Sequence, residues 1–348
     1  MSARTPAART ALGVALVTGA ALLASACGGS GSSGGTTASA AGGSAKVAAV
    51  IKGLDNPFFQ SMEQGVKEQA KTAGVPVTVQ AAASVTDTTG QADKLNGLAG
   101  QDFSCFVVNP ISGTNLIQGV AQLAAKKKTI VNIDSPIDAK AAKAANATPA
   151  TYIGTDNVQA GELAGKRMTE LLPSGGEVAA IGGISGDVTS GARIEGFTKG
   201  LGSNVKLAQT VAANWDRQEA LTQATNVLRA KPQLAGFFVA NDDMGLGVAR
   251  AVADAGKTGK VKIISVDGIK DALEAVKAGQ LDGVVAQYPY AIGAMGLQAC
   301  QAAAKGKTLP AQVKAPVVLV TTANAEKAIA ATPKPFQAYA DPFQDLLK

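Results

Sequence analysis

The chain has 348 residues, more than the roughly 250–300 that usually share one core, so its length predicts two lobes. It contains 46% hydrophobic residues, no histidine and three cysteines, which excludes Ser-His-Asp and Cys-His catalysis, histidine-ligated metals and four-cysteine zinc sites. The net charge is +6, but there is no Lys/Arg-rich run beyond residues 126–128, which argues against nucleic-acid binding.

The N-terminus predicts export from a bacterial cell. Two arginines precede an apolar stretch over residues 11–26, which is shorter than the ~20 residues that span a bilayer. The small residues before Cys27 resemble a lipoprotein box, whose cysteine is acylated and becomes the new N-terminus. We therefore expect a signal peptide over 1–26, a lipidated Cys27 opening a Gly/Ser-rich tether over 27–45, and anchoring to the outer face of the cytoplasmic membrane. Plain secretion is the alternative.

From residue 46 onward, short β-rich runs alternate with helical stretches. The strands expected in the first half are 46–51, 75–79, 103–109 and 129–133, and the helices are 57–73, 89–99 and 115–126. Proline at the start of the first helix and Gly74 after its end suit the two helix termini. An irregular, alanine-rich connection is expected over 138–148.

The same alternation then restarts. The expected strands are 150–154, 177–182, 205–211, 236–240, 261–266 and 281–286, and the helices are 158–172, 190–200, 217–231, 244–255, 270–279 and 292–305. Such alternation predicts an α/β protein with two doubly wound parallel-sheet lobes. The sequence contains neither a GxxxxGK[ST] loop nor a complete GxGxxG motif, so no nucleotide cofactor is expected.

Polar and aromatic residues gather where the predicted strands end, which is where ligands bind in open α/β sheets. These residues are Asn56, Phe58, Phe59, Asp134, Arg193, Trp215, Asn241, Asp267 and Gln287. Carboxylates, amides and a guanidinium suit hydroxyl groups, and an aromatic ring suits the apolar face of a sugar. The set predicts a neutral polyhydroxylated ligand. It pairs no nucleophile with a base, so we expect no enzyme activity, cofactor or metal.

Structural roles remain open for some of these residues. Asp134, Asn241 and Asp267 could simply cap helices, and the phenylalanines could belong to the core. We interpret the adjacent acids at 242 and 243 as a cap followed by a first-turn acid. For Cys105 and Cys300 we expect buried free thiols, with a disulfide as the alternative in an exported protein.

From about residue 46 to 320 the chain resembles the ribose-type periplasmic sugar-binding proteins, the substrate-binding components of ABC importers. The matching segments, in order, are DNPFF, VNID, ARIEGF, WDRQEA, ANDDMGLG, VDG and VVAQ. In that family the corresponding positions hold the sugar, so the resemblance assigns sugar contacts to the nine strand-end residues named above.

The resemblance also implies a type I periplasmic binding fold. One lobe would comprise 46–155 plus 288–318, and the other 156–287 plus 319–348 with a C-terminal extension. Hinge crossings are expected near Thr155-Asp156, Gln287-Tyr288 and Val318-Leu319, about which the lobes close on the ligand.

The function implied is capture of a monosaccharide or sugar alcohol by a monomer and delivery to ABC permease subunits. The alternative is a sugar sensor for a chemoreceptor or sensor kinase. LacI-type repressors share the fold, but they carry a helix-turn-helix where this chain has an export signal. Two departures argue against ribose: Ser135 stands where ribose binders often have arginine, and Trp215 where they tend to have phenylalanine. We expect space or a water molecule beside Asp134.

Overall fold

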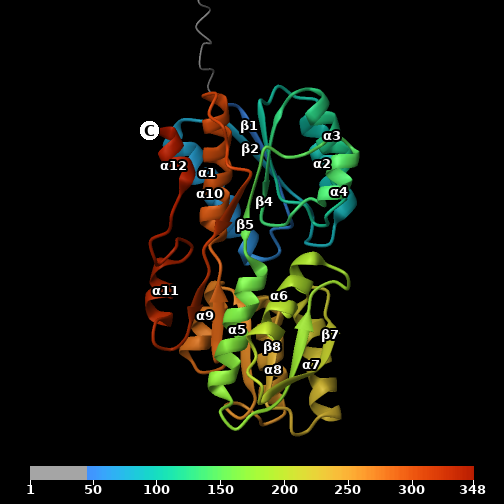
Figure 1. Cartoon of the computed structure of the whole chain (residues 1–348), viewed down its shortest axis with the longest axis vertical. Helices are drawn as coiled ribbons and strands as arrows, with labels where there is room; N and C mark the ends of the chain where they lie inside the picture. The colour runs from blue at the N-terminus through green and yellow to red at the C-terminus, as the bar shows by residue number, and fades with distance from the viewer. Residues whose placement is uncertain (1–44) are drawn as a thin grey trace, which may run out of the picture. The chain divides into compact units, whose positions relative to one another are not determined.

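The computed structural model describes residues 45–348 (Figure 1), so the predicted signal peptide, Cys27 and nearly all of the tether lie outside the described residues. The described chain forms two α/β lobes, each built on a six-stranded sheet. Between residues 45 and 348, no helix is both long and apolar enough to cross a membrane.

The first lobe is built on a fully parallel sheet of order β11-β5-β4-β3-β1-β2. Its strands are β1 (Val47–Ile51), β2 (Val77–Ala81), β3 (Cys105–Val108), β4 (Thr129–Ile133), β5 (Thr151–Thr155) and β11 (Gln312–Ala315). Its helices are α1 (Pro57–Ala73), α2 (Thr88–Ala99), α3 (Ile117–Ala125), α4 (Ala139–Ala144) and α10 (Pro289–Ala304). Alternate residues of β1 point to opposite faces: Val47 and Ile51 join the core under α1 and α10, whereas Ala48 and Val50 join the core under α2 and α3.

The second lobe has the sheet order β12-β10-β9-β8-β6-β7, in which only β12 is antiparallel to its neighbour. Its strands are β6 (Gly176–Gly182), β7 (Val205–Ala212), β8 (Gly236–Val239), β9 (Lys262–Asp267), β10 (Gly283–Ala286) and β12 (Val318–Val320). Its main helices are α5 (Asn157–Leu171), α6 (Val188–Gly200), α7 (Arg217–Ala230), α8 (Asp242–Asp254) and α9 (Lys270–Lys277). Apolar residues again line both faces of the strands, and the predicted doubly wound α/β fold is confirmed.

Three chain segments connect the sheets of the two lobes: the β5–α5, β10–α10 and β11–β12 connections. The third connection lies at residues 316–317, slightly before the expected position. The reason is that Val318 already pairs with Ala286 in the second sheet. The short α4 also differs from expectation, because Asp138 caps it by accepting a hydrogen bond from the amide of Ala141 at 2.7 Å.

The C-terminal segment connects the lobes once more. After β12, α11 (Ala325–Ala331) packs against α9, and the chain then returns to the first lobe, where α12 (Pro342–Leu347) packs against α10 (Figure 1). Phe343 of α12 is fully buried. The assignment of all of 319–348 to the second lobe is therefore wrong for α12, because α10 offers this helix an apolar surface.

A disulfide joins Cys105 in β3 to Cys300 in α10, with their Cα atoms 5.7 Å apart. The expectation of free thiols is thus wrong. The two cysteines are 195 residues apart in the sequence, and only the packing of α10 on the first sheet brings them together.

Replacing Phe343 with alanine should lower the free energy of unfolding by about 3 kcal/mol, because the change removes a buried ring between α12 and α10. Chemical denaturation of the mature protein measures this loss. The matched control is Gln344→Ala, since Gln344 is the exposed neighbour of Phe343 on the same helix. Equal stability of the two variants would contradict the packing of α12.

Candidate functional site

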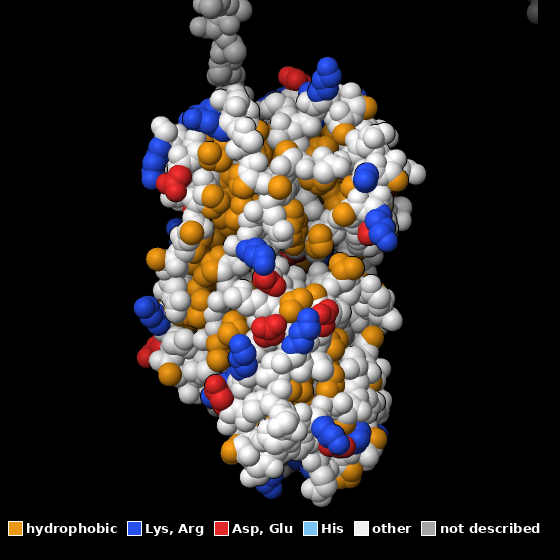
Figure 2. Space-filling model, in the orientation of Figure 1, with side chains coloured by type: hydrophobic (Ala, Val, Ile, Leu, Met, Phe, Trp, Pro, Cys, Tyr) orange, Lys and Arg blue, Asp and Glu red, His pale blue; other side chains and the backbone are white. Residues whose placement is uncertain are grey.

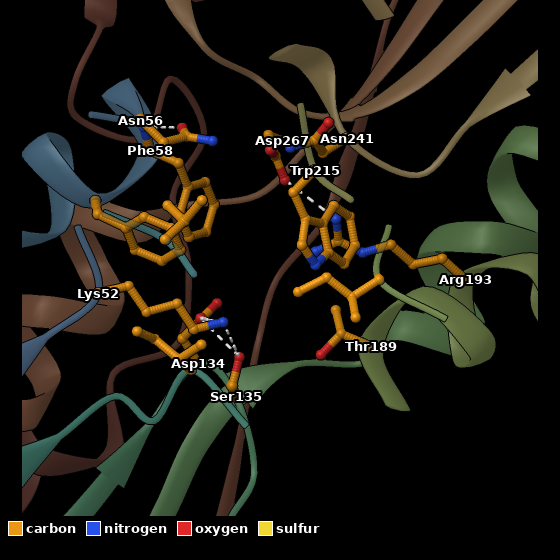
Figure 3. Close-up of a pocket in the computed structure, with 14 residues that line it drawn as sticks. Lys52, Asn56, Phe58, Asp134, Ser135, Thr189, Arg193, Trp215, Asn241 and Asp267 are labelled. Atoms are coloured by element: carbon orange, nitrogen blue, oxygen red, sulfur yellow. Dashed lines mark hydrogen bonds and ion pairs between the residues drawn. The ribbon is translucent and has the colours of Figure 1, made fainter. Parts of the chain in front are cut away.

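A cavity that is partly open to solvent lies between the two lobes (Figure 3); its empty space is about 530 Å³ when the solvent at its open side is counted. It contains every predicted site residue except Gln287. The lining residues are Lys52, Asn56, Phe58, Phe59, Val85, Ile111, Asp134, Ser135, Ile184, Thr189, Arg193, Trp215, Asn241 and Asp267. Most of them follow the carboxyl ends of strands, so the same edge of each sheet faces the cavity.

Two asparagines occupy equivalent places in the two lobes. Asn56 caps α1 by accepting a hydrogen bond from the amide of Phe58 at 2.9 Å, and Asn241 caps α8 by accepting from Met244 at 3.0 Å. Each cap uses only the side-chain oxygen, so the amide nitrogen is left to donate to a ligand. Capping and ligand binding are therefore compatible roles for one side chain.

Aromatic rings form two walls of the cavity (Figure 3). Phe58 and Phe59 meet edge to face with their ring centroids 5.1 Å apart, and Trp215 reaches in from the other lobe. The backbone of Trp215 is left-handed, with φ of 63°, and follows Asn214 at φ of 49°. The indole lies so close to Gly183 that a Cβ atom at that position would overlap it. This tight turn holds the ring at the cavity edge.

Arg193 and Asp267 form a buried ion pair on the second-lobe wall. Nη1 of Arg193 donates to Oδ1 of Asp267 at 3.2 Å and to the carbonyl of Ala240 at 2.6 Å, while its Nε donates to Asn157 at 2.8 Å. Both side chains are about 95% buried. Burial raises the pKa of Asp267, and the nearby guanidinium opposes that rise.

Gln287 lies behind this ion pair and does not line the cavity. Its Nε2 donates to Oδ1 of Asp267 at 2.6 Å, and its Oε1 accepts from the hydroxyl of Thr155. Because Thr155 and Gln287 adjoin two of the connections between the lobes, these bonds link Asp267 to those connections.

The first-lobe wall contains a cation that the sequence analysis missed. Nζ of Lys52 donates to Oγ of Ser135 at 2.6 Å, lies 3.9 Å from Oδ2 of Asp134 and sits 5.4 Å from the ring centroid of Phe59. An ammonium group thus lies on one side of Asp134, while Asp134 and Ser135 also face the open space of the cavity. The sequence could have indicated Lys52 by its position, because it directly follows β1, at the edge of the sheet where the other site residues lie.

The remaining residues missed are Val85, Ile111, Ile184 and Thr189. Three of them are aliphatic and one is a threonine, residue types that occur throughout the chain, so the sequence does not mark them. The charged lining residues comprise two cations, Lys52 and Arg193, and two carboxylates, Asp134 and Asp267. This balance suits an uncharged ligand with many hydroxyl groups. No cluster of three potential metal ligands occurs within the described part of the chain.

The chain is similar to sugar-binding proteins of known identity. Residues 47–308 match the family model of the periplasmic binding protein domain. The D-allose-binding periplasmic protein of Escherichia coli (strain K12) is 40% identical over 271 residues, covering 77% of this chain and 87% of that protein. The ribose import binding protein RbsB of Bacillus subtilis (strain 168) is 29% identical over 271 residues, covering 78% of this chain and 85% of that protein.

Solved structures agree with these relatives. The crystal structure of an ABC transporter periplasmic solute binding protein from Actinobacillus succinogenes 130z, with bound D-allose, superposes with a TM-score of 0.77 and 30% identity. The superposition covers 81% of this chain and 99% of that one.

Replacing Gly183 with alanine should displace Trp215 and shift its fluorescence emission to longer wavelength, because the added Cβ overlaps the indole and pushes it toward solvent. Trp215 is the only tryptophan, so the emission spectrum of the unliganded protein reports on this position alone. Gly191→Ala is the matched control, since nothing lies within 4 Å of a Cβ there. Identical spectra for both variants would contradict the close packing of Trp215 on Gly183.

Proposed function

Because the chain belongs to the periplasmic binding protein family, we propose that it is the substrate-binding component of an ABC importer and captures a monosaccharide between its two lobes. It is a solute-binding protein and not an enzyme. The observation that carries this proposal is one cavity between the lobes in which carboxylates, amides, cations and aromatic rings from both lobes converge.

Each kind of lining residue has a role toward a sugar. The ring of the sugar lies between the phenylalanine pair and Trp215, whose faces accept its apolar C–H surface. Asp134 and Asp267 accept hydrogen bonds from hydroxyl groups, and Arg193 donates to them. Hydrogen bonds to charged groups in a buried site are strong, so the pattern of hydroxyl groups decides the affinity.

The ligand we propose is D-allose or a closely related hexose. Two comparisons support this proposal. The relative at 40% identity is named a D-allose-binding protein, and the structural neighbour at 30% identity has D-allose bound. Lys52 and Trp215 add support, because they give the cavity a second donor cation and a wide aromatic face. A pentose such as ribose would contact fewer of these groups.

Binding requires the lobes to move. Asn56 and Asp134 are 9% exposed, Asp267 5% and Arg193 4%, so a sugar cannot reach them unless the cleft opens. We propose that the connections at residues 156, 287–288 and 316–317 are the hinge and that the closed, sugar-filled form is the one recognised by the permease.

The chain belongs to a family of periplasmic binding proteins, and we propose that residues 1–26 are the signal peptide that exports it. We further propose that the mature protein is a monomer anchored through a lipidated Cys27. The Gly/Ser-rich tether would let the lobes reach the permease from this anchor.

Calorimetric titration of the mature protein with D-allose, D-ribose and other monosaccharides and polyols tests the function and the ligand. We expect D-allose to bind at least tenfold more tightly than ribose, about 1.4 kcal/mol. Asp134→Ala and Asp267→Ala should each weaken binding by about 2–4 kcal/mol, because a desolvated hydroxyl loses its acceptor. Asp254→Ala is the control, since Asp254 is exposed and paired with Arg250. If none of these compounds binds, the proposed function is wrong; if ribose binds most tightly, only the proposed ligand is wrong.

Replacing Cys27 with serine should release the protein from the membrane into the soluble fraction, because serine cannot form the thioether of a lipoprotein. Detergent partitioning of cells that express the two forms measures this change. Membrane association that does not differ between wild type and Cys27→Ser would rule out the lipid anchor and leave plain export.

A further inference from the structure

Asp242 is a fully buried carboxylate just outside the cavity lining. It is the first residue of α8, but its side chain contacts the segment that follows β9. Its Oδ1 accepts a hydrogen bond from the hydroxyl of Ser265, and its Oδ2 accepts from the backbone amides of Gly268 at 2.6 Å and Ile269 at 2.9 Å. One carboxylate thus accepts three hydrogen bonds. Two come from the residues directly after Asp267 and one comes from Ser265 in β9.

The neighbouring acid behaves differently. Asp243 lies near the surface and pairs with Arg217 at 2.6 Å, while the cap of α8 is Asn241. The interpretation of both acids as ordinary helix-start residues therefore applies to Asp243 alone. Asp242 belongs by its contacts to the loop that carries Asp267.

That loop has an unusual backbone. Asp267 has φ of 145° and Gly268 has φ of 86°, values that residues with side chains rarely adopt. The next residue, Ile269, stands at the cap position of α9 and has no side-chain acceptor for the helix amides. Asp242 supplies an acceptor for the amides of Gly268 and Ile269 from another helix. These contacts hold the backbone of the two residues that directly follow Asp267.

Asp242 also acts on Asp267 electrostatically. Burial raises the pKa of both, the charge of Asp242 adds to the rise at Asp267, and Arg193 opposes the rise at each. The charge of Asp134 across the cavity acts on Asp267 in the same direction as that of Asp242. A second buried charge here is unfavourable unless it is fully hydrogen bonded, and Asp242 meets that condition through its three donors.

We propose that Asp242 is a positioning residue for sugar binding: it holds the loop after β9 so that Asp267 faces the cavity and Arg193 (Figure 3). The inference rests on the proposed function. Asp242 would affect the affinity for the sugar through the loop, without contacting the sugar itself.

The test compares Asp242→Ala with Asp242→Asn by calorimetric titration of the mature protein with the monosaccharide that wild type binds most tightly. Asparagine can keep all three contacts, because its oxygen accepts from the two amides and its NH₂ group donates to Oγ of Ser265. We expect the asparagine variant to bind within threefold of wild type and the alanine variant at least tenfold more weakly. The control Asp243→Ala should bind as wild type does.

Denaturation without sugar accompanies each titration, so that a loss of affinity is read only from a folded variant. If Asp242→Ala does not fold, Ser265→Ala takes its place; it removes one donor and should weaken binding threefold or more. A folded alanine variant that binds like wild type overturns the inference, and so does an equal loss in the asparagine and alanine variants. Failure of wild type to bind any monosaccharide overturns the proposed function itself and, with it, this inference.

Discussion

The buried guanidinium of Arg193 is the interaction on which the ligand-facing edge of the second lobe depends. It joins α6 to Asn157 at the start of α5, to the carbonyl of Ala240 after β8 and to Asp267 at the end of β9. A buried ion pair stabilises a protein only when its remaining donors and acceptors are also satisfied. Here backbone and side-chain partners meet that need, and Gln287 extends the network to Thr155, beside a connection between the lobes.

The same site concentrates unusual backbone conformations. Asp134, Trp215 and Asp267 all have positive φ values, of 59°, 63° and 145°. Such conformations cost free energy, on the order of 1–3 kcal/mol each, and persist where surrounding contacts hold them. The contacts are visible in each case: the hydroxyl of Tyr152 donates to the carbonyl of Asp134, the indole of Trp215 packs on Gly183, and the donors described above hold Asp267.

The C-terminal segment packs against Tyr288, a residue next to the site. Tyr288, which lies between β10 and α10, packs against Phe336 and Tyr339, with ring-centroid distances of 6.3 and 6.4 Å. Figure 2 shows one face of the molecule, on which hydrophobic side chains lie among basic and acidic side chains that in several places adjoin one another. The helices α11 and α12 therefore pack against the two lobes. The segment between them adds a fourth chain connection to the three that join the sheets.

The sequence by itself determined the alternation of strands and helices and the edge at which polar residues gather, because both follow from local periodicity and from the rule that parallel strands end together. That is why Asn56 and Trp215, far apart in the chain, could be assigned to one cavity. Only the tertiary structure decided that Lys52 stands beside Asp134, and that Gln287 lies behind the site. These positions depend on how loops fold over distant neighbours, which no local pattern encodes. The disulfide over 195 residues and the return of α12 to the first lobe have the same cause: long-range packing.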